Sequence, residues 1–206
     1  LLGLTLMASG ALATTYVANL SGGQEVPPHA TPAIGQATAV LTGNVLSLSG
    51  SFSGLLANFT ASHIHQAPAG ANGGVIFTLA TAPAGTSGSW IPGANNFTLS
   101  AAQLTALQSG NYYVNVHSQI WPGGEIRGQL LLAPPAPVSD LTIAYDPVLV
   151  QIALSWSASA NAISYRVESS PALGGPWTSE GTTLTTSWLQ TPLPDSTRIF
   201  RVIALN

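Results

Sequence analysis

The chain has 206 residues, of which only 5% are charged, and it contains neither lysine nor cysteine. Ordinary soluble domains carry about 25% charged residues, so electrostatic capture of nucleic acid or anionic lipid is excluded as a main activity. The absence of cysteine excludes disulfides and thiol chemistry.

Residues 1–13 are predicted to be a secretory signal peptide. Their apolar run ends in small residues, with Ala11 and Ala13 in the A-x-A pattern that precedes cleavage. A run of about 13 residues is too short to span a bilayer. We therefore expect a secreted, extracellular or cell-surface protein without an integral membrane span.

Residues 14–133 are expected to form an all-β domain. Short runs of alternating apolar and polar residues, rich in Val, Thr, Tyr and Leu, are separated by Gly, Pro and Asn. Only residues 98–110 favour a helix, with Ser100 as the N-cap and Gly110 as the stop signal.

The alternation in three of these runs assigns side chains to faces. In "SHIHQ", residues 62–66, Ile64 should point into the core and His63 and His65 away from it. The runs "NYYVNVHSQ", residues 111–119, and "GEIRGQL", residues 124–130, follow the same rule. We expect an outer sheet face that carries Tyr113, Asn115, His117, Glu125, Arg127 and Gln129.

Glu25, Glu125 and Arg127 are the only charged residues of this domain. They are predicted to form a structural ion cluster that ties the N-terminal loop to the last strand. The alternative role for Arg127 is to bind an anionic ligand. A nearby guanidinium would hold both carboxyls ionised, which disfavours a general acid, and no catalytic residue is predicted.

All four histidines lie in this first domain. A His-x-His pair on a strand, joined by a histidine from another strand, is a common nitrogen site for copper or zinc. His63, His65 and His117 would supply three ligands, and His29 a fourth from a loop. The alternative is structural, with His63 and His65 hydrogen-bonding the glycine-rich loop "QAPAGANGG", residues 66–74.

The stretches "LSGGQEVPP", "GQATAVL", "ASHIHQAPAGANGGVIFTL" and "LQSGNYYVNVHSQIWPGGEIRGQL" occur in that order over residues 16–132. Together they resemble the chordin-type extracellular repeat, the CHRD domain. The resemblance implies an extracellular immunoglobulin-like or Greek-key β-barrel or sandwich.

A Pro-rich linker, residues 134–138, is expected before a second all-β domain, residues 139–206. The stretches "LVQIALSWSAS", "ISYRVESS" and "STRIFRVIALN" resemble a fibronectin type III β-sandwich, with Trp156 in its core and its last strand missing. Phe200 stands where that family usually has a tyrosine.

These features predict a secreted, non-enzymatic surface or matrix protein with a ligand-binding, adhesion or assembly domain. Its partners would be an extracellular protein, a polysaccharide or identical subunits, and assembly into filaments would proceed by β-strand addition. The alternative is a copper- or zinc-binding metalloprotein, distantly like Cu/Zn superoxide dismutase.

Overall fold

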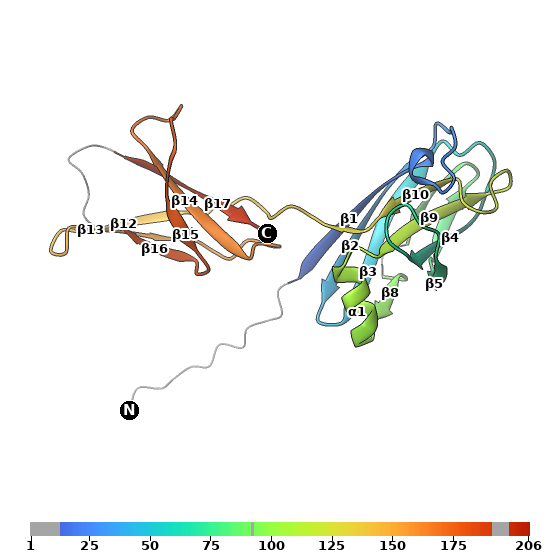
Figure 1. The fold of residues 1–206 in the computed structure, drawn as a ribbon, viewed down its shortest axis with the longest axis horizontal. Coiled ribbons are helices and arrows are strands. Elements are labelled where there is room, and N and C mark those ends of the chain that lie inside the picture. The colour runs from blue at the N-terminus through green and yellow to red at the C-terminus, as the bar shows by residue number, and fades with distance from the viewer. Residues whose placement is uncertain (1–12, 92, 191–197) are drawn as a thin grey trace. The chain divides into compact units, whose positions relative to one another are not determined.

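The computed structural model describes residues 13–91, 93–190 and 198–206, and the chain divides into two compact units between Ala133 and Pro134 (Figure 1). Nearly all of the predicted signal peptide, residues 1–12, lies outside the described residues. Within the described ranges, every helix is too short or too polar to cross a lipid bilayer.

The first unit is one curled antiparallel sheet whose strands follow the order β5-β4-β9-β10-β1-β2-β3-β7-β6, with β11 beside β1 and β8 beside β3. Its elements are β1 (Thr14–Ser21), η1 (Gly22–Gln24), β2 (Ile34–Thr42), β3 (Val45–Ser53), β4 (Phe59–Gln66), β5 (Gly74–Thr78), β6 (Thr81–Ala84), β7 (Ser87–Trp90), β8 (Asn96–Thr98), α1 (Ala101–Gln108), β9 (Tyr112–Ser118), β10 (Ile126–Gln129) and β11 (Leu131–Leu132). The predicted all-β, sandwich-type architecture is confirmed.

The core of this unit is built from the alternate residues of its strands. Leu20, Leu48, Ile64 and Val114 are each at most 2% exposed and belong to one continuous apolar cluster. Ile64 therefore faces inward, as the alternation in "SHIHQ" predicts. The histidines on either side of it, His63 and His65, point to the opposite face of the sheet, away from the apolar core.

The predicted helix is confirmed as α1. The Ser100 side chain accepts a hydrogen bond from the Gln103 backbone N–H, and the Gln103 side chain accepts one from the Ser100 N–H. This reciprocal capping box satisfies N–H groups that have no partner inside the helix. The helix connects β8 to β9, the strand that carries Tyr113, Asn115 and His117.

The second unit consists of two three-stranded antiparallel sheets, ordered β12-β13-β16 and β15-β14-β17. Their strands are β12 (Thr142–Asp146), β13 (Gln151–Ser155), β14 (Ser164–Ser170), β15 (Thr178–Thr183), β16 (Ser187–Gln190) and β17 (Ile199–Leu205). Trp156 and Phe200 are buried in the core of this unit, with Leu154, Tyr165, Val167 and Val202.

Candidate metal centre

Strands β4, β9 and β10 lie side by side and share one polar face (Figure 1). His63 is paired with Asn115, His65 with Tyr113, and Arg127 with Asn115. Directly paired residues of antiparallel strands project to the same side of the sheet. The predicted common face of the three strands is therefore present.

This face is buried, however, and the expectation that it lies on the outside of the sheet is wrong. All seven residues of β9 are buried, including Tyr113, Asn115 and His117. Three loops cover them. Glu25 accepts a hydrogen bond from Asn115, the Gly73 N–H donates to Tyr113 Oη, and the Pro122 carbonyl accepts from His117.

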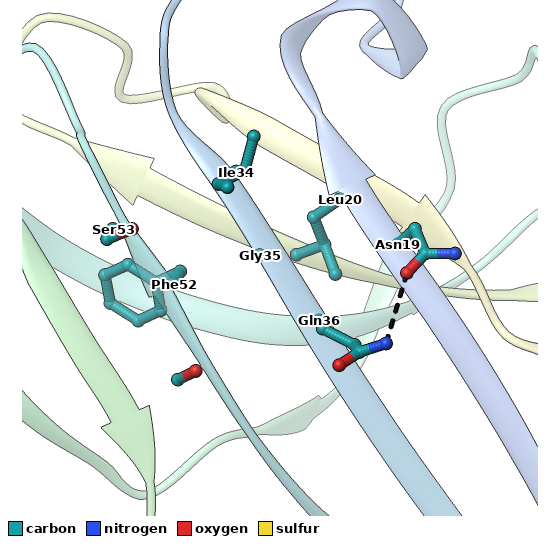
Figure 2. Close-up of a pocket in the computed structure, with 8 residues that line it drawn as sticks. Asn19, Leu20, Ile34, Gly35, Gln36, Phe52 and Ser53 are labelled. Atoms are coloured by element: carbon teal, nitrogen blue, oxygen red, sulfur yellow. Dashed lines mark hydrogen bonds between the residues drawn. The ribbon is translucent and has the colours of Figure 1, made fainter.

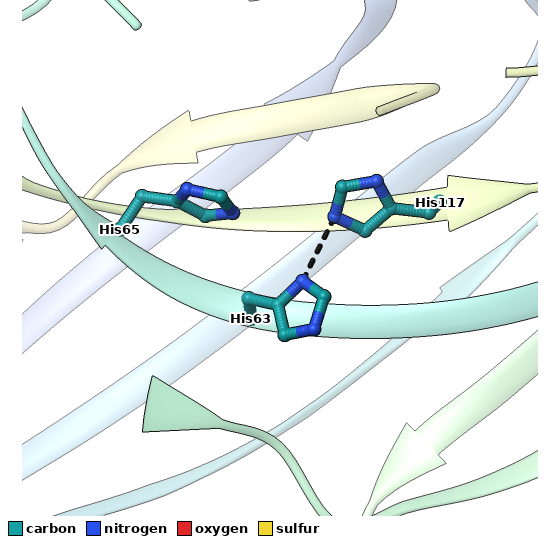
Figure 3. Close-up of side chains that lie close together, drawn as sticks. All are labelled: His63, His65 and His117. Carbon is teal, nitrogen blue, oxygen red and sulfur yellow. Dashed lines mark hydrogen bonds between the residues drawn. The ribbon is translucent and has the colours of Figure 1, made fainter. Parts of the chain in front are cut away.

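Three histidines converge under this cover (Figure 3). His63 and His65 come from β4, and His117 comes from β9, two residues beyond the partner of His63. One ring nitrogen of each lies within 4.8 Å of the others, and His63 Nδ1 is 3.0 Å from His117 Nε2. The structure thus brings together the three predicted ligands from two strands.

Backbone carbonyls fix the tautomers of two of these rings. His65 Nδ1 lies 2.9 Å from the Gly73 carbonyl oxygen, and His117 Nδ1 lies 3.0 Å from the Pro122 carbonyl oxygen. A carbonyl only accepts, so both Nδ1 atoms carry the proton and both Nε2 atoms keep a lone pair. His65 Nε2 has no hydrogen-bond partner, whereas His117 Nε2 accepts from His63 Nδ1 at 3.0 Å. A ring held through one nitrogen, with a lone pair on the other, is typical of metal-binding histidines.

Burial keeps the three rings neutral. Loss of solvation lowers the pKa of His117 to about 4. The bond to the Pro122 carbonyl acts against this shift, and the neighbouring His63 and His65 add to it. Burial likewise lowers the pKa of His63, with a further effect from His65, and lowers the pKa of His65. Neutral imidazole is the form that binds a metal ion, so protons compete little for these nitrogens near neutral pH.

The donor set fits a copper or zinc ion. His65 Nε2 is buried and has no hydrogen-bond partner, although a buried polar atom normally has one. An ion about 2.0–2.1 Å from each ligand requires nitrogens about 3.3–3.6 Å apart. The observed separations of 3.0 Å and up to 4.8 Å bracket this range, so small side-chain rotations would complete the site.

Tyr113 also belongs to the site, although its pattern in the sequence indicated only a shared face. Its ring stacks on His65 with centroids 4.9 Å apart and planes 9° apart. Its hydroxyl accepts the Gly73 N–H at 3.1 Å, and the Gly73 carbonyl holds His65. The signal in the sequence was its place four residues before His117 on the same face of a strand.

His29 lies outside this group. Its ring stacks on Trp121 with centroids 3.8 Å apart, and its Nε2 lies 2.9 Å from the Glu125 carbonyl oxygen. The predicted fourth ligand is thus engaged in attaching its loop to the segment before β10, and the three-histidine group is complete without it.

The predicted ion cluster does not form as a set of ion pairs. Among the described residues, the ion pairs all lie in the second unit. Glu125 Oε1 instead accepts from the Thr31 hydroxyl and the Leu56 N–H. Burial raises the pKa of Glu25 to about 7, against the lowering effects of Asn115 and Arg127. The expectation that Arg127 holds Glu25 firmly ionised is therefore not met.

A separate hollow lies over β1, β2 and β3 (Figure 2), and its lining residues are Asn19, Leu20, Ile34, Gly35, Gln36, Ser51, Phe52 and Ser53. Its lining has no titratable side chain, so it offers only hydrogen bonds and apolar contacts to a ligand.

The raised pKa of Glu25 predicts a pH-dependent stability. Between about pH 4.5 and pH 7 the folded chain holds the Glu25 proton more tightly than the unfolded chain does, so this group's stabilising contribution is lost as the pH rises. Glu25→Gln removes the ionisation but keeps an oxygen for Asn115. We expect the urea midpoint of the variant, relative to that of the wild type, to increase between about pH 5 and about pH 8. A constant or shrinking difference would show that the pKa is not raised.

The CHRD domain family matches residues 16–130, which is more than half of the 206-residue chain. No curated protein matches the chain. The match covers β4, β9 and β10 and thus the whole histidine site, and it supports a non-enzymatic, extracellular-type β domain. The chain belongs to the CHRD domain family.

Proposed function

We propose that this chain is a secreted, non-enzymatic extracellular protein whose CHRD domain binds one copper or zinc ion through His63, His65 and His117. The observation that carries the proposal is the convergence of three neutral imidazoles on one point beneath a covering loop. Two of them already present an unprotonated Nε2, because backbone carbonyls hold their Nδ1–H groups.

The ligand type favours these two metals. Imidazole nitrogen suits copper and zinc, whereas magnesium and calcium prefer oxygen ligands. His63 would bind through Nδ1, which faces His117 Nε2 at 3.0 Å, and its remaining proton would move to Nε2. His63 is only partly buried, so the ion has a path from solvent and a further coordination position.

The second unit supports the extracellular assignment as a spacer. We propose that its two three-stranded sheets form a fibronectin type III-like module, with Trp156 and Tyr165 packed edge to face at 5.3 Å in its core. The neutral hollow over β1, β2 and β3 suits a polysaccharide or a protein partner better than a charged one.

A second candidate function, self-assembly by strand addition, is favoured by one observation in this unit. Ile143 and Tyr145 are paired with Leu154 and Ile152 and so share the core-facing side of their sheet, yet they are 55% and 57% exposed. In the second sheet of this unit, β15-β14-β17, one edge of β17 pairs with β14. No described strand pairs with the opposite edge of β17. A strand from an identical subunit would extend that sheet over the exposed pair.

Metal titration tests the first proposal. We expect the purified chain to bind one equivalent of Cu²⁺ or Zn²⁺ in calorimetry and the double variant His63→Ala/His65→Ala to bind none at this site. His29→Ala is the matched control, because His29 is engaged with Trp121 outside the group. Equal binding by the double variant, or equal loss in the control, would contradict the assignment.

Gly73 provides a finer test of the loop that anchors His65. A Cβ at Gly73 would lie 1.9 Å from the Gln66 carbonyl oxygen, whereas a Cβ at Gly74 would meet nothing within 4 Å. Gly73→Ala should move the loop and its carbonyl, and weaken metal binding about 10- to 100-fold, as loss of such an anchoring group typically does. Gly74→Ala should bind like the wild type. Equal affinities of the two variants would refute the anchoring role.

Strand addition is tested by sedimentation over a range of concentrations. We expect association that Ile143→Lys weakens, because the charge would lie on the exposed core-facing side, while Leu184→Lys, at a position 82% exposed, has no effect. A chain that stays monomeric at every concentration, or equal effects of both variants, would exclude this mode of assembly.

A further inference from the structure

Arg127 is a buried cation without a carboxylate partner. The other three arginines of the chain all have one: Arg166 and Arg201 pair with Glu168, and Arg198 pairs with Glu180, at 2.6–2.9 Å. Their side chains are 32–45% exposed, whereas Arg127 is 2% exposed and has no ion pair among the described residues. Buried charges are ordinarily paired, so the charge of Arg127 calls for a partner from outside the chain.

The contacts of Arg127 hold its guanidinium in place without neutralising it. Its NH1 group donates to the Ala71 carbonyl at 3.0 Å and to Asn72 Oδ1 at 3.2 Å. Its Cζ lies 3.7 Å from the centroid of the Tyr113 ring, in a cation–π contact. All of these partners are neutral. A planar guanidinium fixed by stacking and by one of its nitrogens is pre-organised to bind with its remaining donors.

Arg127 lines a pocket of about 430 Å³. It is bounded by the β10 residues Arg127 and Gln129, by the loop residues Ala69 and Gly70, and by the segment that contains Glu25 and Val26. The volume lies within the range of small-molecule sites, which are mostly apolar with a few fixed polar groups. Glu25 forms no ion pair with Arg127 among the described residues, and its Oε1 accepts a hydrogen bond from Asn115 at 2.6 Å.

We propose that this pocket binds a small molecule that carries one carboxylate, with the carboxylate oxygens on the Arg127 guanidinium and the rest of the molecule against Val26, Pro28 and Ala69. The planar fork of arginine matches a carboxylate. A single cation balances a single negative charge, and Glu25 in the same pocket disfavours a dianion such as phosphate. The proposal does not depend on the metal site, which lies on the other side of the Tyr113 ring.

The test uses the full chain, free of metal, with benzoate as the probe and benzamide as its neutral analogue. The chain has four arginines, so the Arg127 Nε–H signal can be assigned by its loss in Arg127→Lys. We expect benzoate to shift this signal in a saturable manner and benzamide to bind at least about tenfold more weakly. Inorganic phosphate should also bind more weakly than benzoate.

Two variants locate the site. Ala69→Phe fills the pocket from an exposed loop and should weaken benzoate binding at least about tenfold, whereas Ala84→Phe, at an exposed position on β6, should leave it unchanged. Because Ala69 is exposed, this comparison remains decisive if Arg127→Lys fails to fold. Equal affinity for benzoate and benzamide, equal effects of the two phenylalanine variants, or no shift at about 50 mM benzoate would each overturn the proposal.

Discussion

The structure of the first unit depends on the burial of a polar sheet face. Strand β9 is buried on both sides: one side faces the apolar core, and the other carries Tyr113, Asn115 and His117. Each polar group on this side has lost water and needs a partner within the protein, since an unpaired buried polar group costs about 1–3 kcal/mol. The loops that pass over the face supply those partners.

This constraint explains the chemistry of the site. The Gly73 and Pro122 carbonyls cover the face and also set the protons of His65 and His117 on Nδ1. The same burial lowers the pKa of all three histidines and leaves His65 Nε2 without a partner. A buried nitrogen without a hydrogen-bond partner is unfavourable, and a bound metal ion would provide the missing partner for His65 Nε2.

The Tyr113 ring separates two regions of different character beneath the loops. On one side it stacks on His65, and on the other it contacts the Arg127 guanidinium. The charge of Arg127 helps to lower the pKa of His65, so a partner that neutralised Arg127 would also act on the histidine group. The proposed metal site and the proposed carboxylate site thus share one aromatic side chain.

Much of this arrangement could be predicted from the sequence, because alternation along a strand is local. The pattern around Ile64 and Val114 predicted that the histidines and Tyr113 lie on one face, and the pairing of β4 with β9 in the structure brings them together. The cover over that face could not be predicted. It comes from the loops at residues 25–29, 67–73 and 121–124, and alternation within β9 does not show which loops pack against the strand. His29 was misassigned for the same reason: its stacking on Trp121 is a contact between two loops.

The predicted helix and the predicted charge cluster differ in the same way: the first rests on a local signal and the second on contacts between distant segments. Ser100 indicated the helix start as an N-cap, and α1 begins directly after it at Ala101. The predicted cluster of Glu25, Glu125 and Arg127 rested on rarity of charge, which does not determine distance. Glu125 instead binds the Thr31 hydroxyl and the Leu56 N–H.

Nitrogen-15 NMR of the histidine side chains in the metal-free chain near neutral pH tests the proposed metal site directly. His65 and His117 should be neutral, with the proton on Nδ1 and a lone pair on Nε2. Rings that are protonated on both nitrogens, or that carry their single proton on Nε2, would contradict the proposed site, because the backbone carbonyls would then not orient these nitrogens toward a metal ion.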